Sequence, residues 1–281
     1  MSAPLVKAAA KTAGIVDTLG QQFAEELRQV LRALERKLRG VVDEATQGKP
    51  TAIVRAVQAN KARKGIQGAL TASGYPELAE TAYGPRLDQL TAAVLTGRKL
   101  ARASSALAAG AEGKLEALRL LGQRDLLHAG DDAAYRLWQA TVRGVFGARS
   151  ADDILHDLAG LIDLTEPRLR TLYDTSLSIY GRQVEALQAG DNPEATFAYM
   201  GPVDRKTREF CLQHAGKVYT RDQIDALDNG QIDNVFLTGG GYNCRHIWME
   251  VSRFSELRDF VDTPQRVPEV EEQLGELKEA A

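Results

Sequence analysis

Apolar residues recur at intervals of four or three positions from about Thr18 to Ala45, with charged residues between them. This spacing predicts an amphipathic helix, because about 3.6 residues per turn bring such positions onto one face. The same spacing forms the seam of a coiled coil, so the stripe suits either the protein's own core or a partner helix. Gly48 and Pro50 are expected to end the helix. The stripe comprises Leu19, Phe23, Leu27, Leu31, Leu34, Leu38 and Val41.

The middle of the chain predicts further helices. Residues 51–147 contain helical stretches separated by turns that carry glycine, proline or capping residues. Ser150 is the first residue of a capping-box pattern, and its hydroxyl can accept a hydrogen bond from a free backbone amide. A helix is therefore expected from 151 to about 162. Pro167 suits the first turn of a second helix, expected from 165 to about 189.

The pattern changes after about residue 194. The segments ATFAYMGPVD (195–204) and RHIWMEVS (245–252) are rich in aromatic and other large apolar residues, and they predict strands. Between them, Thr220 and Gln223 match a capping box that predicts one short helix. The fold class expected is therefore a mainly α N-terminal region followed by a small α+β C-terminal domain.

Composition supports this fold class and narrows the choice of function. Aromatic residues make up 6% of the 281 residues, whereas alanine and leucine are abundant, which argues against an all-β fold. No run of about 20 apolar residues occurs, so we expect no membrane-spanning helix and a soluble, cytoplasmic protein. The net charge of −3 excludes a protein that coats nucleic acid by bulk charge alone.

Charge is distributed unevenly between the two ends. Residues 1–64 contain 12 basic and 6 acidic residues, and this basic N-terminal third is a candidate for contact with DNA or with an acidic protein surface. Residues 251–281 contain 4 basic and 8 acidic residues. The tail after Pro264 is therefore expected to be a loosely held acidic helix or disordered.

Both cysteines and two of the four histidines fall within 36 positions: Cys211, His214, Cys244 and His246. Two such pairs from separated segments can close a tetrahedral Cys2His2 zinc site, which would stabilise a unit otherwise short of core. A buried Cys/His cluster without metal is an equal alternative. A disulfide is a weaker one, because the cytoplasm is reducing.

The same residues permit two enzyme interpretations. A hydrolytic zinc would keep one position open for water and use Asp204 or Glu209 as base. Alternatively, Cys211 would be a nucleophile with His214 or His246 as base. Four protein ligands favour a closed structural site instead, and such Cys/His combinations are common by chance.

Residues Asp204–Tyr219 and Gly239–Trp248 together resemble the C-terminal domain of the phage head morphogenesis family, the minor head proteins similar to the F protein of phage Mu. The resemblance covers about residues 145–255 and places this domain after a helical region, 1–144, and before an acidic tail, 256–281. Many relatives have a cysteine where this chain has His246, and their proline-rich approach to the second segment is replaced here by LTGGG.

Carried over by position, the resemblance implies a set of motif residues. The family's cysteines fall on Cys211 and Cys244, and the exchange of a cysteine for His246 keeps metal-ligand chemistry at that position. His214 and the zinc ion come from the spacing described above and not from the resemblance. We expect Asp204 to accept from Arg205, Arg208 or Arg245, because a buried carboxylate needs such partners. The structural motif comprises Asp204, Arg205, Thr207, Arg208, Gly216, Asn243 and Arg245.

The resemblance also implies a function without catalysis. The chain is expected to be a minor capsid component that acts in head morphogenesis and associates with the portal and the major capsid or scaffold proteins. It would be found in the virion, and in the host cytoplasm during assembly. The basic N-terminal third would be the part to touch packaged DNA. The alternatives are a Cys/His or metal-dependent enzyme and a zinc-stapled DNA-binding module.

Overall fold

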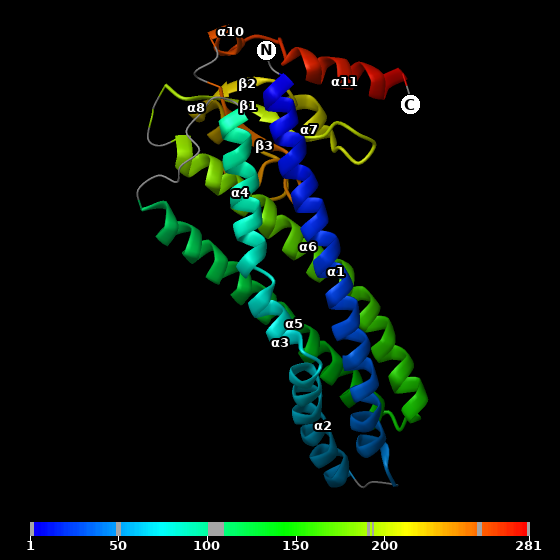
Figure 1. The fold of residues 1–281 in the computed structure, drawn as a ribbon. Coiled ribbons are helices and arrows are strands. Elements are labelled where there is room, and N and C mark those ends of the chain that lie inside the picture. Colours follow the sequence, from blue (N-terminus) through cyan, green and yellow to red (C-terminus); the bar gives the residue numbers. More distant parts are fainter. Residues whose placement is uncertain are drawn as a thin grey trace. The chain divides into compact units, whose positions relative to one another are not determined.

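The computed structural model describes residues 3–48, 52–100, 110–189, 192, 194–251 and 255–279. A helical N-terminal region precedes a small antiparallel sheet of three strands near the C-terminus, so the predicted fold class is confirmed (Figure 1). None of the described helices combines the length and the apolar character needed to cross a bilayer. The helices are α1 (Ala3–Thr46), α2 (Ala52–Ala72), α3 (Tyr75–Thr81), α4 (Gly84–Leu100), α5 (Ala111–Phe146), α6 (Ala151–Ala189), α7 (Glu209–His214), α8 (Arg221–Asp225), α9 (Val235–Thr238), α10 (Ser255–Arg258) and α11 (Pro268–Glu279).

The chain forms two compact units whose segments alternate along the sequence. The sheet unit consists of Met1–Leu19, Pro85–Leu120 and Asp174–Ala281, and the helical unit consists of Gly20–Gly84 and Leu121–Tyr173. Three consecutive segments were expected from the sequence instead, because local patterns cannot pair helices that are distant in the chain.

The helical unit buries most of the stripe predicted on α1. Leu27 and Leu38 are almost inaccessible to solvent. At the end of the stripe, Val42 is fully buried where Val41 was expected. An α-helix has 3.6 residues per turn, so its buried face shifts by one position over several turns relative to a pattern with a period of 3.5. Phe23 stacks on Tyr173 of α6 with ring centroids 4.1 Å apart. The helix starts at Ala3, earlier than expected, and Gly48 has the left-handed conformation predicted for its end. Pro50 lies outside the described residues.

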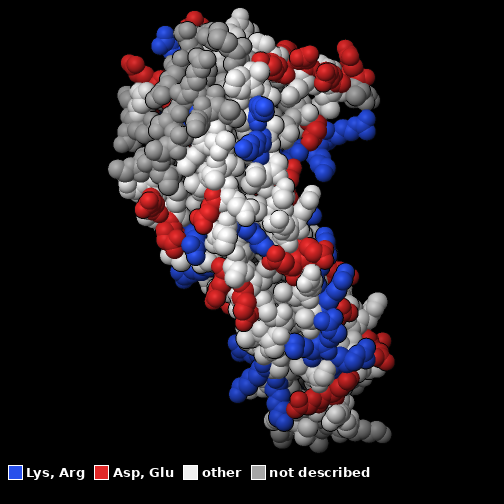
Figure 2. Space-filling view, in the orientation of Figure 1, with Lys and Arg blue, Asp and Glu red and all other residues white. Residues whose placement is uncertain are grey.

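Charged side chains of both signs are interspersed on the face drawn in Figure 2. Within the helical unit, Arg39 lies 3.7 Å from Asp152 and Lys61 lies 3.8 Å from Glu44. Several basic residues of the N-terminal third therefore have acidic neighbours.

The predicted break between two helices at 162–165 is wrong, because α6 runs without interruption and contains Pro167. Its apolar residues continue through this region, where Ile162 is 7% and Leu169 1% exposed. Burial of this stripe offsets the cost of a proline inside a helix, about 3 kcal/mol. The start was predicted correctly: the Asp153 amide donates to Ser150 Oγ at 3.2 Å.

The sheet has β1 (Thr196–Met200) at its centre, paired antiparallel with β2 (Val218–Thr220) and β3 (Ile247–Glu250). Both strands predicted from the sequence are confirmed, as is the capping box of Thr220 and Gln223. Side chains alternate between two core clusters, as the period of two requires. Phe197, Tyr199, Cys211, Cys244 and Trp248 belong to one cluster, and Ala198, Met200, Met249, Leu5 and Val270 belong to the other.

The C-terminal segment is more firmly attached than the sequence analysis expected. Val270 and Leu274 of α11 are 1% and 8% exposed and belong to the core of the sheet unit. Arg266 donates to the carbonyl oxygens of Leu212 and Gln213, each at 3.0 Å. The many acidic residues of α11 led to the expectation of a loosely held segment, but its buried apolar residues are enough to attach the helix to the sheet unit.

Candidate metal centre

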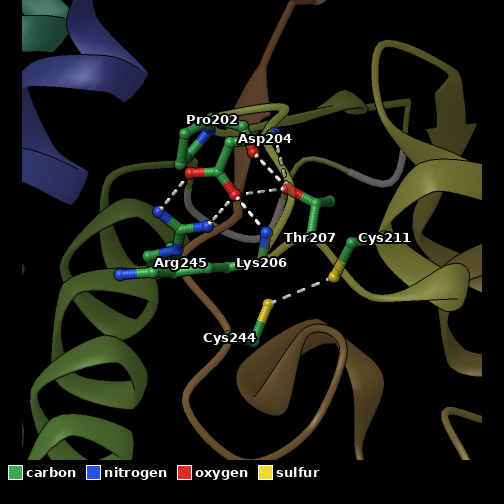
Figure 3. A network of polar contacts seen from close by, with 7 residues as sticks. All are labelled: Pro202, Asp204, Lys206, Thr207, Cys211, Cys244 and Arg245. Atoms are coloured by element: carbon green, nitrogen blue, oxygen red, sulfur yellow. Dashed lines mark hydrogen bonds and ion pairs between the residues drawn. The ribbon is translucent and has the colours of Figure 1, made fainter. Parts of the chain in front are cut away.

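The thiols of Cys211 and Cys244 and the imidazole of His246 lie close together. Cys211 comes from α7, and Cys244 and His246 come from the loop that leads into β3. Their side chains are 2–3% exposed, and the candidate ligand atoms all lie within 4.8 Å of one another. Figure 3 shows the two sulfur atoms facing each other, with a separation of 3.8 Å. This group can hold a metal ion.

Glycines allow the surrounding backbone to approach these ligands. A Cβ added to Gly240 would overlap Cys211 Sγ, and one added to Gly201 would lie 2.6 Å from His246 Cγ. Gly239 and Gly241 have positive φ angles, 59° and 89°, which glycine adopts without steric cost. Small residues and turns therefore form a close-fitting wall around the ligands.

The imidazole of His246 has an orphaned nitrogen. Its Nε2 is buried and has no hydrogen-bond partner among the described residues. A buried nitrogen of this kind costs free energy unless another group satisfies it. A metal ion between His246 and the two sulfurs would supply that partner.

Tyr199 of β1 completes the surroundings of the thiols and was missed by the sequence analysis. Its hydroxyl lies 3.1 Å from Cys244 Sγ and 3.5 Å from Cys211 Sγ, and its ring stacks on His246 with centroids 5.0 Å apart. Burial raises the pKa of this fully buried phenol well above 10. Because side chains alternate along a strand, Tyr199 lies on the same face of the sheet as Trp248. This alternation is the only signal in the sequence that could have indicated the position of Tyr199.

Arg182 of α6 fixes the loop that carries Cys244 and His246. Its guanidinium is buried and donates to the carbonyl oxygens of His246 at 2.8 Å, Cys244 at 2.7 Å and Leu237 at 3.1 Å. Nothing in the sequence separates this arginine from Arg168, which is exposed on the same helix.

The two thiols differ in acidity because they share one hydrogen bond. The bond to Cys244, together with burial, raises the pKa of Cys211. Burial acts in the same direction on Cys244, but the hydrogen bond from Cys211 and the charge of Arg182 outweigh it and lower the Cys244 pKa.

His214 lies outside the group, although the sequence analysis included it among the four ligands. Its Nδ1 is 2.6 Å from the Tyr219 hydroxyl, and its ring lies against Phe210. Burial, with smaller contributions from Lys217 and Arg266, lowers its pKa to about 4. The structure thus brings together three of the four expected ligands, because α7 directs the fourth towards β2.

Asp204 joins the two motif segments, as expected, and Arg245 is its arginine partner. The contacts are bidentate, at 2.8 and 2.6 Å, and the pKa of Asp204 falls to about 2, mainly through this hydrogen bonding (Figure 3). Thr207 donates to the same carboxylate at 3.2 Å. Arg208 instead donates to Gly240 O at 2.9 Å, and Arg205 is exposed.

The two remaining motif residues shape the backbone. Gly216 has φ 75° in the turn before β2, where an added Cβ would lie 2.9 Å from Val270. Asn243 has φ 54°, and its backbone amide donates to Thr175 Oγ1 at 3.1 Å. Both support the site from the backbone and supply no ligand atom to it.

Comparison with known proteins finds no matching family model, no matching curated protein and no matching solved structure.

Proposed function

We propose that this chain is a structural component of a phage head, a minor capsid protein that acts in head morphogenesis and associates with the portal. The observation that carries the proposal is the contact between the two segments that resemble the morphogenesis family. Asp204 binds Arg245 across 41 positions, and Cys211 lies against Cys244 across 33. Residues that give the segments their resemblance are thus the residues that hold them together.

The same proposal includes a structural zinc ion bound by Cys211, Cys244 and His246. With Zn–S bonds of about 2.3 Å in a tetrahedron, two sulfurs lie about 3.8 Å apart. The observed separation of 3.8 Å matches this value. All three ligands are buried, which suits a closed structural site better than a catalytic one that must admit substrate.

The portal and the major capsid or scaffold proteins are the proposed partners, in the virion and during assembly in the host cytoplasm. Contact of the basic N-terminal third with packaged DNA stays a prediction. Pairs such as Arg39 with Asp152 would compete with phosphate for these cations.

Co-expression with the portal protein of the same phage tests the assembly role. We expect the full chain to co-purify with the portal, and not with an unrelated phage's portal expressed in its place. Failure to co-purify across a range of salt concentrations would overturn the proposal. Turnover that Cys211→Ala abolishes in a folded protein would favour an enzyme, and duplex binding with a steep salt dependence would favour a DNA-binding module.

Metal analysis tests the zinc ion separately. Protein purified without chelator should contain about one zinc per chain, and chelation should lower its melting temperature. Cys244→Ser should abolish binding, whereas His214→Gln should retain it because His214 lies outside the group. Sub-stoichiometric metal with an unchanged melting temperature after chelation would exclude the structural zinc.

A further inference from the structure

We infer that Tyr199 is the fourth ligand of the metal ion, so that the site is a closed Cys2His-Tyr centre. This inference rests on the metal ion of the proposed function. It assigns a role to a residue of β1 that lies outside both motif segments.

The phenol oxygen of Tyr199 lies close to both sulfurs. In a tetrahedral site with a metal–oxygen bond of about 2.0 Å and metal–sulfur bonds of about 2.3 Å, oxygen and sulfur lie about 3.5 Å apart. Tyr199 Oη is 3.5 Å from Cys211 Sγ and 3.1 Å from Cys244 Sγ. The shorter distance corresponds to a hydrogen bond with Cys244, which the metal would replace.

The rings of Tyr199 and His246 lie against each other. Tyr199 stacks on His246 with 19° between the ring planes, so the two side chains extend side by side into the same site. Because His246 Nε2 is orphaned among the described residues, the imidazole also needs a partner there. The phenol oxygen thus lies against both sulfurs, and the imidazole, which belongs to the same ligand group as those sulfurs, stacks on the phenol ring.

All four residues of the inferred centre are buried. Tyr199 is 0% exposed, and the other three ligand residues are 2–3% exposed. A buried three-ligand site would need a water molecule to complete a tetrahedron, whereas Tyr199 already supplies an oxygen between both sulfurs. His214 is not available for this role because its Nδ1 is engaged with Tyr219.

Cobalt(II) substituted for zinc in the full chain provides the test, because its visible absorption reports the number and type of ligands. In the wild-type protein, we expect a four-coordinate spectrum that added imidazole or a small thiol leaves unchanged. In Tyr199→Phe, the open position should bind these molecules and change the spectrum, and cobalt affinity should fall at least about tenfold.

Tyr219→Phe is the matched control. It removes a phenol that packs against the same core cluster and binds His214, but that lies outside the ligand group. Its cobalt spectrum and affinity should equal those of the wild type. If Tyr199→Phe does not fold, the response of the wild-type spectrum to added imidazole still decides the question.

The outcomes separate this inference from the proposed function. Equal spectra and affinities for wild type and Tyr199→Phe, or a wild-type spectrum that imidazole changes, would overturn the tyrosine ligand and leave the metal in place. Absence of any cobalt binding by the wild type would overturn both the ligand and the proposed metal.

Discussion

Asp204 and Arg245 are joined by two hydrogen-bonded contacts, of 2.8 and 2.6 Å, that cross from the start of one motif segment to the loop before β3. The loop also carries the candidate metal ligands Cys244 and His246. This ion pair therefore connects the candidate metal ligands to the turn at Asp204, where the carboxylate also accepts from the Lys206 amide at 2.9 Å.

Asp204→Asn should reduce stability at neutral pH but not in strong acid. The pKa of Asp204 is about 2 in the folded protein and near 3.8 when unfolded, so its contribution is complete above pH 5 and is lost as pH falls towards 2. Since the side chain is 42% exposed, we expect a loss of about 1 kcal/mol at pH 7. Urea unfolding at pH 7, 4 and 2.5 measures the difference.

Asp225→Asn is the control for this prediction, because Asp225 forms a single exposed contact with Arg221 at 2.8 Å. Its effect should stay within about 0.5 kcal/mol at every pH. Equal losses in the two variants would contradict a special role for the Asp204 ion pair.

Arg182→Met should destabilise the sheet unit strongly. The substitution leaves the carbonyl oxygens of Leu237, Cys244 and His246 without the buried donors that Arg182 provides, and the expected loss is roughly 3–5 kcal/mol. Arg182→Lys should recover only part of this, because an ammonium cannot donate in a planar fork. Equilibrium unfolding in urea gives both values, with exposed Arg136→Met as a control expected to change little.

Local signals explain what the sequence could predict. The strand at 196–200 and the capping box of Thr220 and Gln223 depend on neighbouring residues, and both are present. Charge alone predicted that Asp204 pairs with one of three arginines. Which of the three is the partner, Arg245, depends on the path of the folded loop. Pro167 shows the opposite case, since burial of the α6 stripe overrides a strong local signal.

The residues that sequence analysis missed are polar groups buried by long-range packing. Tyr199 and Arg182 lie on different elements, and neither belongs to a motif with a chemical spacing. His214 was assigned as a ligand because cysteine and histidine proximity in sequence cannot show which way a short helix turns its side chains. Its contact with Tyr219 depends on the position of β2.

Gly201→Ala and Gly240→Ala should each weaken metal binding and stability. An added Cβ would press on His246 in the first variant and on Cys211 in the second. Overpacking of this kind costs typically about 1–3 kcal/mol.

The matched control is Gly160→Ala within α6, where a Cβ meets nothing within 4 Å and where stability should rise by about 0.5–1 kcal/mol. Thermal unfolding with and without zinc would compare them, and unaltered zinc affinity in both site variants would contradict the close-fitting wall.

Glu185→Gln should remove a pH dependence of stability near neutrality. Arg98 Nη1 lies 2.8 Å from Glu185 and its Nη2 lies 3.4 Å from Glu250, with Arg98 and Glu185 both under 5% exposed. Burial raises the pKa of Glu185 to about 7, and Glu250 adds to this while Arg98 opposes it. Because the folded pKa is the higher one, the stability linked to this group is complete below about pH 4.5 and is lost as pH rises through 7.

The free energy of unfolding of the wild type should therefore fall between pH 5 and 8, relative to Glu185→Gln, by roughly 3 kcal/mol. Urea unfolding at half-unit intervals across this range measures the slope. Glu116→Gln serves as the control, since Glu116 is 52% exposed beside Arg119 and should leave the slope unchanged. A Glu185→Gln variant with the slope of the wild type would show that another group titrates in this range, because glutamine at that position has no proton to gain.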